Sequence, residues 1–523
     1  MIRSTWFRGR AGFVLLSAVE LFLLQEATFA LAYNPGTLFS LVARATRFFS
    51  DLFLLGAITL LLPRVGMIVM AVVALGINLG LVAYYSYFGI PLSLFTMMNQ
   101  WREGRDVAKF SITAIPLLAA VLFGAALLAK IFLVRSARGT RIQLRRALAA
   151  SAALFVAYVG LQAAFSCYDR PSLIREIVPP ARFARGRGYT ELWLAEWYYL
   201  DNSAVLKRAT DTTRMASDRL TDLEVPLKIA SRLIIIQVES LGFEAVDQTI
   251  DGKELMPFLD RLKDQSLFYR MRSPKRFGSA DADFCILNAQ WPSPDCINYK
   301  IPNFPYDGAL PRFLKQFGFQ TTCLMGDAGS TFSRRGPYEQ MGFEEILFKE
   351  ELLARYPVEI DDFGVRDPDL FRVSSILIRK PTDSRRPAKP ICQFIVTTTS
   401  HWPWHNLHDS EKEIFPKSTA EVENYCNAFR SFDHTLCDYM MTLPPRTTVV
   451  IYGDHTSRIK FRNIVADWHG TTHFVPCWVY VVGENLAAQQ RTRNSPVARD
   501  GSLTLLDLAN YIRSQVRRSY AAP

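Results

Sequence analysis

Residues 233–240 read LIIIQVES, a run of apolar and β-branched side chains that stops abruptly at a glutamate and a serine. Helical patterns such as MPFLDRLKDQS (256–266) lie between this run and others like it. The other runs of this kind are at 321–326, 391–400, 447–454 and 474–482. Short strands that alternate with helices are typical of an α/β fold. We therefore predict an α/β domain with a mostly parallel central sheet for residues 231–523.

Five apolar stretches precede this domain, at 11–32, 48–62, 65–88, 111–134 and 144–165. Most of them reach the roughly 20 residues that a helix needs to cross a lipid bilayer. We predict an N-terminal transmembrane domain of five helices over residues 1–166. Residues 167–230 form a connector with amphipathic helical character, which either lies on the lipid head groups or packs on the domain beyond.

The positive charge of the chain is confined to its apolar part. Residues 1–166 hold 15 of the 60 Lys and Arg but only 5 of the 49 Asp and Glu, so they carry +10 of the net +11. Basic residues before the first stretch and in the loop before the last one mark the cytoplasmic side. Five spans then place the following domain outside the cytoplasm. Because that domain is nearly neutral, we expect no nucleic-acid partner.

All eight cysteines lie at position 167 or later, where an extracytoplasmic location permits disulfides. Two pairs have similar short spacings, and we predict one bridge between Cys285 and Cys296 and another between Cys426 and Cys437. The cysteines on the strand-like runs are expected to be small buried hydrophobic residues.

Polar side chains follow the predicted strands where each strand ends. Glu239 ends the first run, His401 follows the third, and Asp454 and His455 end the fourth. Ligands collect at the carboxyl ends of strands in such sheets. Each residue alone is compatible with a helix cap or a satisfied turn, but carboxylates and imidazoles together suit Zn²⁺ or Mn²⁺. The pattern predicts a metal site at this edge of the sheet.

Residues 275–284 read KRFGSADADF, in which Ser279 follows a glycine and precedes two aspartates. In isolation the segment is either a polar turn or the site of a nucleophilic hydroxyl. Asp281 and Asp283 are expected to cap the following helix rather than to bind metal.

Together these segments resemble the lipoteichoic acid synthase-like branch of the alkaline phosphatase/sulfatase superfamily and the related phosphoethanolamine transferases. IIIQVESLGFEA resembles the strand with the metal-binding glutamate, GSADADF the nucleophile turn, and YGDHT the Asp-His metal pair. TTTSHWPW carries the substrate-side histidine, and FGVRDPDLF (363–371) matches a segment of structural role. The resemblance covers nearly the whole chain. It implies five membrane helices followed by an alkaline-phosphatase/sulfatase-like α/β domain.

The resemblance also implies the roles of individual residues. His401 would act on the substrate side, with His469, or its close competitor His473, exchanging protons at the reacting oxygens or holding a second metal. Arg334 and Arg335 are candidates to bind the phosphate. One divalent cation, Zn²⁺ or Mn²⁺, is expected, and a second ion stays an open alternative. The metal ligands carried over are Glu239, Ser279, Asp454 and His455.

The activity implied is a transferase in the bacterial cytoplasmic (inner) membrane, multi-pass, with its catalytic domain on the periplasmic side. Ser279 would take a head group from phosphatidylethanolamine or phosphatidylglycerol and pass it to a hydroxyl of a cell-surface glycan or glycolipid. The lipid bilayer is then a partner, and envelope polysaccharide machinery is a further candidate. The alternative is a phosphodiesterase or sulfatase-like hydrolase that uses water as the acceptor. A third interpretation is a membrane assembly subunit without catalysis.

Two features leave the head group open. Met325 stands where the lipoteichoic acid enzymes have a histidine that helps to bind glycerol phosphate, whereas cysteines near the nucleophile are a feature of the phosphoethanolamine transferases.

A sulfatase needs Cys or Ser in a C/S-x-P-x-R context, and Ser279 is instead followed by Ala-Asp-Ala-Asp.

Overall fold

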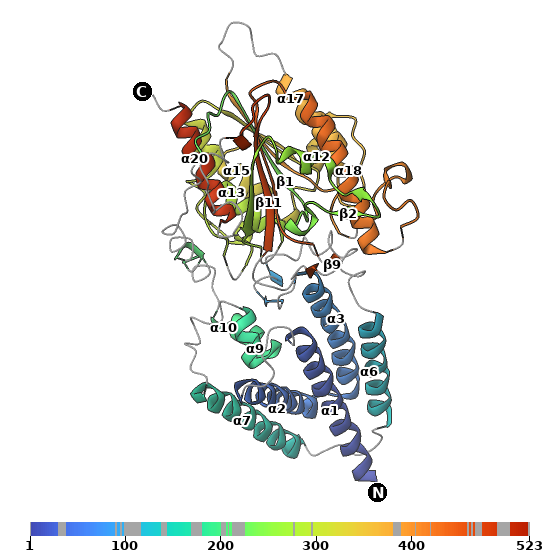
Figure 1. Cartoon of the computed structure of the whole chain (residues 1–523). Coiled ribbons are helices and arrows are strands. Elements are labelled where there is room, and N and C mark those ends of the chain that lie inside the picture. Colours follow the sequence, from blue (N-terminus) through green and yellow to red (C-terminus); the bar gives the residue numbers. More distant parts are fainter. Residues whose placement is uncertain are drawn as a thin grey trace. The chain divides into compact units, whose positions relative to one another are not determined.

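The computed structural model divides the chain into two compact units, Met1–Val205 and Leu206–Pro523 (Figure 1). We describe each unit by itself. The residues described are 2–29, 38–88, 92–94, 97–98, 117–136, 144–168, 180–199, 206–207, 209–211, 225–275, 278–293, 296–379, 389–402, 404–418, 420–457, 460–461, 464–465, 473–488 and 503–520.

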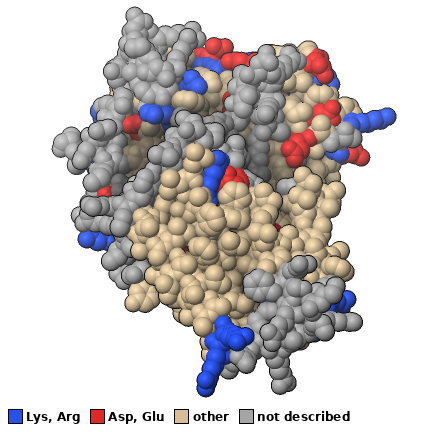
Figure 2. Space-filling model, turned by 90° about the horizontal axis from the view of Figure 1, so that it is seen from below, with Lys and Arg blue, Asp and Glu red and all other residues tan. Residues whose placement is uncertain are grey.

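The first unit is helical. Its long helices are α1 (Ile2–Phe29), α2 (Leu38–Leu61), α3 (Arg64–Phe88), α6 (Leu117–Ser136) and α7 (Leu144–Tyr168). Within the described residues, three segments are long and apolar enough to cross a membrane: Arg64–Tyr85, Leu117–Arg135 and Arg145–Ser166. Large apolar side chains such as Leu128 and Phe132 of α6 are about 70% exposed, and Figure 2 shows a face on which uncharged side chains predominate. This surface suits contact with lipid.

Two short helices, α9 (Pro180–Arg187) and α10 (Tyr189–Tyr199), follow in the predicted connector. They belong to the first unit, where Phe183, Tyr189 and Leu192 pack with Leu24 of α1 and Leu81 of α3. This part of the connector therefore packs on the N-terminal helices.

The second unit contains a seven-stranded sheet in the order β4-β11-β8-β1-β7-β5-β6. β11 runs antiparallel to both β4 and β8, whereas the other neighbouring strands are parallel, which confirms the predicted α/β fold. The strands are β1 (Arg232–Val238), β4 (Leu267–Ser273), β5 (Gln320–Met325), β6 (Glu345–Leu347), β7 (Ile391–Val396), β8 (Thr448–Gly453) and β11 (His473–Val481). Two small hairpins pair β2 (Thr249–Ile250) with β3 (Lys253–Glu254), and β9 (Lys460–Phe461) with β10 (Ile464–Val465).

Helices cover the sheet on both sides (Figure 1). On one side lie α13 (Ser279–Asn288), α15 (Arg335–Met341) and α20 (Leu505–Tyr520). On the other lie α12 (Pro257–Leu262), α17 (Asp367–Arg379) and α18 (Glu421–Thr442). The shorter helices α14 (Leu310–Lys315) and α16 (Lys349–Arg355) complete the unit. Strands buried on both faces read as continuous apolar runs, which explains why Leu233–Val238 shows no alternation.

Candidate active site

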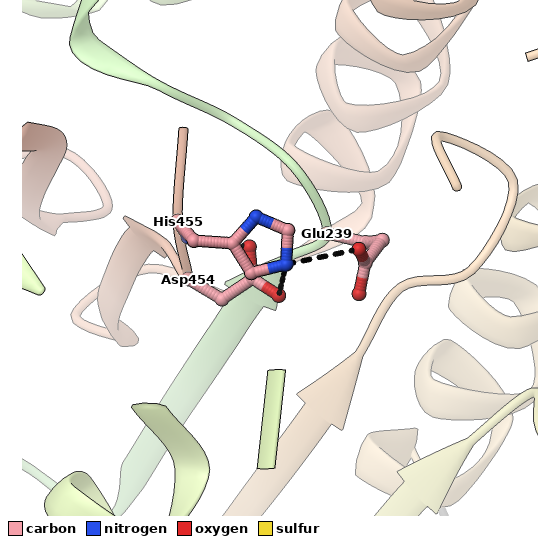
Figure 3. Close-up of side chains that lie close together, drawn as sticks. All are labelled: Glu239, Asp454 and His455. Atoms are coloured by element: carbon pink, nitrogen blue, oxygen red, sulfur yellow. Dashed lines mark hydrogen bonds and ion pairs between the residues drawn. The ribbon is translucent and has the colours of Figure 1, made fainter. Parts of the chain in front are cut away.

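Three side chains from two adjacent strands meet at the carboxyl edge of the sheet. β1 and β8 pair in parallel with Val238 opposite Gly453, so Glu239 and Asp454 leave the sheet side by side. His455 Nε2 lies 3.4 Å from Glu239 Oε1 and 3.6 Å from Asp454 Oδ2 (Figure 3). One ligand atom from each of the three residues lies within 4.8 Å of the others, and all three are buried.

The donor set fits a divalent cation. Asp454 Oδ2 is buried, and among the described residues it accepts no hydrogen bond. Burial and the neighbouring charge of Glu239 hold the pKa of Asp454 well above its ordinary value. Burial alone would raise the pKa of Glu239 as well, but the hydrogen bond and charge of His455 outweigh it and keep that pKa low. Two crowded carboxylates with an unused oxygen need a positive charge, and carboxylate with imidazole suits Zn²⁺ or Mn²⁺.

Ser279 lies beside this cluster as the first residue of α13. Its hydroxyl donates a hydrogen bond of 2.5 Å to Glu239 Oε2. Its backbone carbonyl accepts from Gln237 Nε2 at 3.2 Å, and Gln237 in turn accepts from Tyr452 at 2.6 Å. Gly278 before it has a φ of 136°, a conformation that favours glycine. The sheet therefore fixes the hydroxyl at the N-terminus of a helix, where backbone N–H groups favour an anion.

His401 lies near the cluster, where a positive charge on its ring would help to lower the pKa of Glu239, after the larger effects of burial and of His455. Its ring centroid lies 4.2 Å from that of Phe363, and its Nδ1 lies 2.7 Å from the Trp402 carbonyl. Asp367, in the segment FGVRDPDLF, holds the loop that leads to His401, because it accepts a hydrogen bond of 2.8 Å from the backbone N–H of Thr398.

The structure separates the two candidate arginines. Arg334 is 2% exposed, its Nε donates to Asp283 Oδ2 at 2.7 Å, and its Nη2 has no hydrogen-bond partner among the described residues. Arg335 is partly exposed and forms ion pairs with Glu350 and Glu351 at 3.1 and 2.8 Å. The charge of Arg335 is compensated at the surface, so Arg334 is the better candidate to bind an anion. Asp283 is an ion-pair partner and caps no helix.

The other histidines lie in different surroundings. His473 is buried at the start of β11, and its Nδ1 lies 2.7 Å from the hydroxyl of Thr456, the residue after His455. His473 thus contacts the loop that carries Asp454 and His455. His405 and His408 are exposed, as expected. His469 lies outside the described residues.

Both disulfide predictions are wrong, because Cys285, Cys296, Cys426 and Cys437 are free thiols. Cys426 and Cys437 lie on one helix, α18, at a separation of about 16 Å along its axis, and a disulfide requires Cα atoms within about 7 Å. Cys285 is buried on α13, where the charges of Asp507 and Arg513 of α20 act on its thiol.

The structure adds residues that the sequence analysis did not single out for this site. Lys275 is buried. The pKa of His455 is lowered by the burial of its own ring and also by the positive charge of Lys275. Lys300 is buried with its Nζ 5.9 Å from the ring centroid of Phe332. Asp327 follows β5, and burial raises the pKa of its carboxyl although the charges of Arg334 and His401 act to lower it. Only Lys275 had a signal in the sequence, its position next to the nucleophile turn.

The sulfatase family model matches residues 231–511, more than half of the chain. The chain belongs to the sulfatase family. Lipoteichoic acid synthases of Staphylococcus saprophyticus and Staphylococcus aureus are each 22% identical to it over 330 residues, which is 59% of this chain. The sulfatase-family chain spans about half the length of these curated relatives.

One solved structure resembles nearly all of this sulfatase-family protein. It is the integral membrane protein lipooligosaccharide phosphoethanolamine transferase A (EptA) from Neisseria meningitidis, with a TM-score of 0.57 and 14% identity. The likeness covers 97% of this chain and 95% of that one, so both units take part in it. At this identity the comparison establishes the fold alone.

Proposed function

We propose that the protein is a membrane-bound, metal-dependent transferase that moves a phospholipid head group, phosphoethanolamine or glycerol phosphate, to a hydroxyl of a cell-surface glycan or glycolipid. The observation that carries this proposal is the hydrogen bond from Ser279 to Glu239, beside Asp454 and His455. A serine hydroxyl at a helix N-terminus and a metal-type donor set form the machinery of phosphoryl transfer through a covalent serine intermediate.

A divalent cation held by Glu239, Asp454, His455 and Ser279 would lower the pKa of the serine hydroxyl and screen the phosphate charge. Ser279 Oγ, deprotonated to the alkoxide, attacks the phosphorus, a new O–P bond forms, and the bond to the diacylglycerol oxygen breaks. The N-terminus of α13 stabilises the phosphoryl oxygens through its backbone N–H groups. The Trp402 carbonyl accepts a hydrogen bond from Nδ1 of His401, so Nε2 of the imidazolium form is the atom that gives the leaving oxygen its proton. An acceptor hydroxyl then gives its proton to His401 Nε2 and attacks the phosphorus, and the bond to Ser279 Oγ breaks to release the alkoxide.

We also propose that all five long helices cross the inner membrane and place the catalytic unit on the periplasmic side. Charged residues lower the hydropathy of α1 and α2, but their side chains pair inside the bundle. Glu20 forms a buried ion pair with Lys130 and accepts a hydrogen bond of 2.8 Å from Asn78. Asp51 accepts from Gln25 at 2.9 Å. Paired polar groups of this kind are compatible with a spanning helix.

Mass spectrometry of Ser279 tests the proposed function. The full-length, metal-loaded protein is incubated in vesicles with phosphatidylethanolamine or with phosphatidylglycerol and then digested. We expect a phosphoethanolamine or phosphoglycerol adduct on Ser279 and none in Ser279→Ala. Full-rate release of free head group without an acceptor would favour a hydrolase. Absence of any adduct and of head-group release would refute the proposal.

A further inference from the structure

Asp283 is placed to serve both the nucleophile and the candidate phosphate-binding arginine. It lies four residues after Ser279 on α13 and is fully buried. Its carboxylate accepts a hydrogen bond of 2.8 Å from Tyr299 on Oδ1, and one of 2.8 Å from Tyr338 on Oδ2. Arg334 Nε donates to Oδ2 at 2.7 Å. Three donors therefore converge on one side chain of the nucleophile helix: Tyr299 from one segment, and Arg334 and Tyr338 from the N-cap and body of α15.

Arg334 is held by only part of its guanidinium group. Nε is bound to Asp283, whereas the buried Nη2 has no hydrogen-bond partner among the described residues. Leaving a buried charged donor unsatisfied costs free energy that a bound anion would recover. The guanidinium carries its donors in a rigid fork, so fixing Nε fixes the direction in which Nη2 points.

The loop that carries Arg334 is also in contact with the nucleophile turn. The ring centroid of Phe332 lies 4.8 Å from the guanidinium carbon of Arg334. A Cβ placed on Gly278 would lie 3.0 Å from Cζ of the same Phe332 ring. Phe332 and Ser333 have φ values of 54° and 57°, which are strained for these residues. The ring therefore rests against the residue that precedes Ser279, and the surrounding contacts stabilise the strained loop.

We infer that Asp283 is a positioning residue, which orients Arg334 so that Nη2 faces the phosphoryl group bound at Ser279. Because Asp283 and Ser279 share one helix, this arrangement fixes the donor and the nucleophile relative to each other. The inference rests on the proposed function only in taking the anion to be a phosphoryl group. A residue with a purely structural role would stabilise the fold without changing phosphate affinity.

A double-mutant cycle on phosphate affinity separates these roles. The dissociation constant of inorganic phosphate is measured for the metal-loaded, full-length protein and for Asp283→Asn, Arg334→Ala and the double variant. We expect each single variant to weaken binding by about 10- to 100-fold, the range for a hydrogen bond to a charged group. The double variant should bind no more weakly than Arg334→Ala, because Asp283 acts through Arg334. Additive losses, or unchanged affinity in Asp283→Asn, would overturn the inference.

Asp433→Asn is the matched control, because Asp433 is an equally buried aspartate that binds backbone N–H groups of α12. It should lower stability and leave phosphate affinity unchanged. If Asp283→Asn does not fold, a crystal structure of the unmutated protein with phosphate decides the matter. Arg334 should then reach the phosphate through Nη2 while Nε stays on Asp283, and a phosphate at Ser279 without this contact would contradict the inference. Neither experiment involves a lipid, so a missing lipid adduct on Ser279 is a separate result.

Discussion

At the scale of single residues, two glycines allow the site to form. A Cβ on Gly453 would lie 1.9 Å from the Leu241 carbonyl oxygen, so only glycine lets β8 pass the end of β1 and bring Asp454 next to Glu239. Gly278 takes a φ of 136° immediately before Ser279. The missing side chain at Gly453 and the backbone conformation of Gly278 place the candidate metal ligands and the nucleophile within reach of one another.

The proposed metal dependence can be tested at His455. We expect chelation to abolish phosphoryl transfer and Zn²⁺ or Mn²⁺ to restore it in the unmutated protein. His455→Ala should lose most of its bound metal because one of the buried ligands is removed. At a metal concentration of 100 times Kd the ion stabilises the fold by about 2.7 kcal/mol, so the melting temperature should rise with metal in the unmutated protein and not in the variant. Equal metal content measured by mass spectrometry would contradict this assignment.

At the scale of elements, the nucleophile helix is held at both ends. Its N-terminus lies against β1 through Gln237, and its C-terminal carbonyls at Ile286 and Leu287 accept hydrogen bonds from Arg513 of α20. Burial lowers the pKa of Arg513 to about 10, so the side chain stays charged at neutral pH. A cation at this end of a helix is favoured by the helix dipole. The same helix α20 also binds the segment that precedes β1, since the Tyr511 hydroxyl donates a hydrogen bond to the Val225 carbonyl.

Arg513→Met keeps the length of the side chain but removes these donors. We expect the free energy of unfolding to fall by about 2–3 kcal/mol, because buried carbonyls lose their partners. Formation of phospho-Ser279 should also slow down as α13 loosens. Thermal unfolding and adduct formation check the two effects. The exposed Arg518 on the same helix provides the control, and Arg518→Met should change neither quantity.

A second prediction concerns the contact of α12 with α18. Asp433 accepts hydrogen bonds from the N-terminal N–H groups of α12, and burial raises its pKa to about 6. Between pH 4 and 6, roughly, the folded protein keeps a proton that the unfolded chain has released, so stability falls as the pH rises through this window. The shift corresponds to about 3 kcal/mol at about 1.4 kcal/mol per pKa unit. Thermal unfolding against pH should show a shallower decline in Asp433→Asn, and parallel profiles would refute the assignment.

At the scale of the whole molecule, the two units solve the problem of burying charge in different ways. The second unit has three of its buried charged residues, Glu239, Asp454 and His455, together at one sheet edge, where a cation would balance the two carboxylates. The helical unit pairs its charges internally, as between Glu20 of α1 and Lys130 of α6. Breaking such a pair leaves one buried charge uncompensated, which costs more than removing both.

The Glu20–Lys130 pair gives a prediction for the helical unit. Lys130→Met should destabilise the protein by about 3–5 kcal/mol, and adding Glu20→Gln should recover most of that loss. The folded fraction that survives heating in detergent is the measurement. Arg146→Met, at an exposed position of α7, should have no effect. If the double variant is as unstable as Lys130→Met, the ion pair is not the source of the stability.

Local patterns were enough to predict the α/β fold and the edge of the sheet at which polar residues gather. The predicted strands end abruptly at polar residues, and parallel strands bring their carboxyl ends together at one edge of the sheet. Glu239, Asp454 and His455 could therefore be grouped without a structure. The cysteine pairing was also open to a local test, since the helical pattern over Cys426 and Cys437 already separates them. That prediction failed because spacing was considered without helix geometry.

Long-range packing decided the rest. Arg334 and Arg335 are adjacent and chemically identical, and only the fold buries one against Asp283 and leaves the other with surface glutamates. Asp283 itself looked like a capping residue because its partners, such as Tyr338, come from distant segments. The sequence alone determined which chemical groups stand at the strand ends, since that depends on neighbours along the chain. The tertiary structure decided which of the remaining polar groups face the site, since that depends on contacts between segments far apart in sequence.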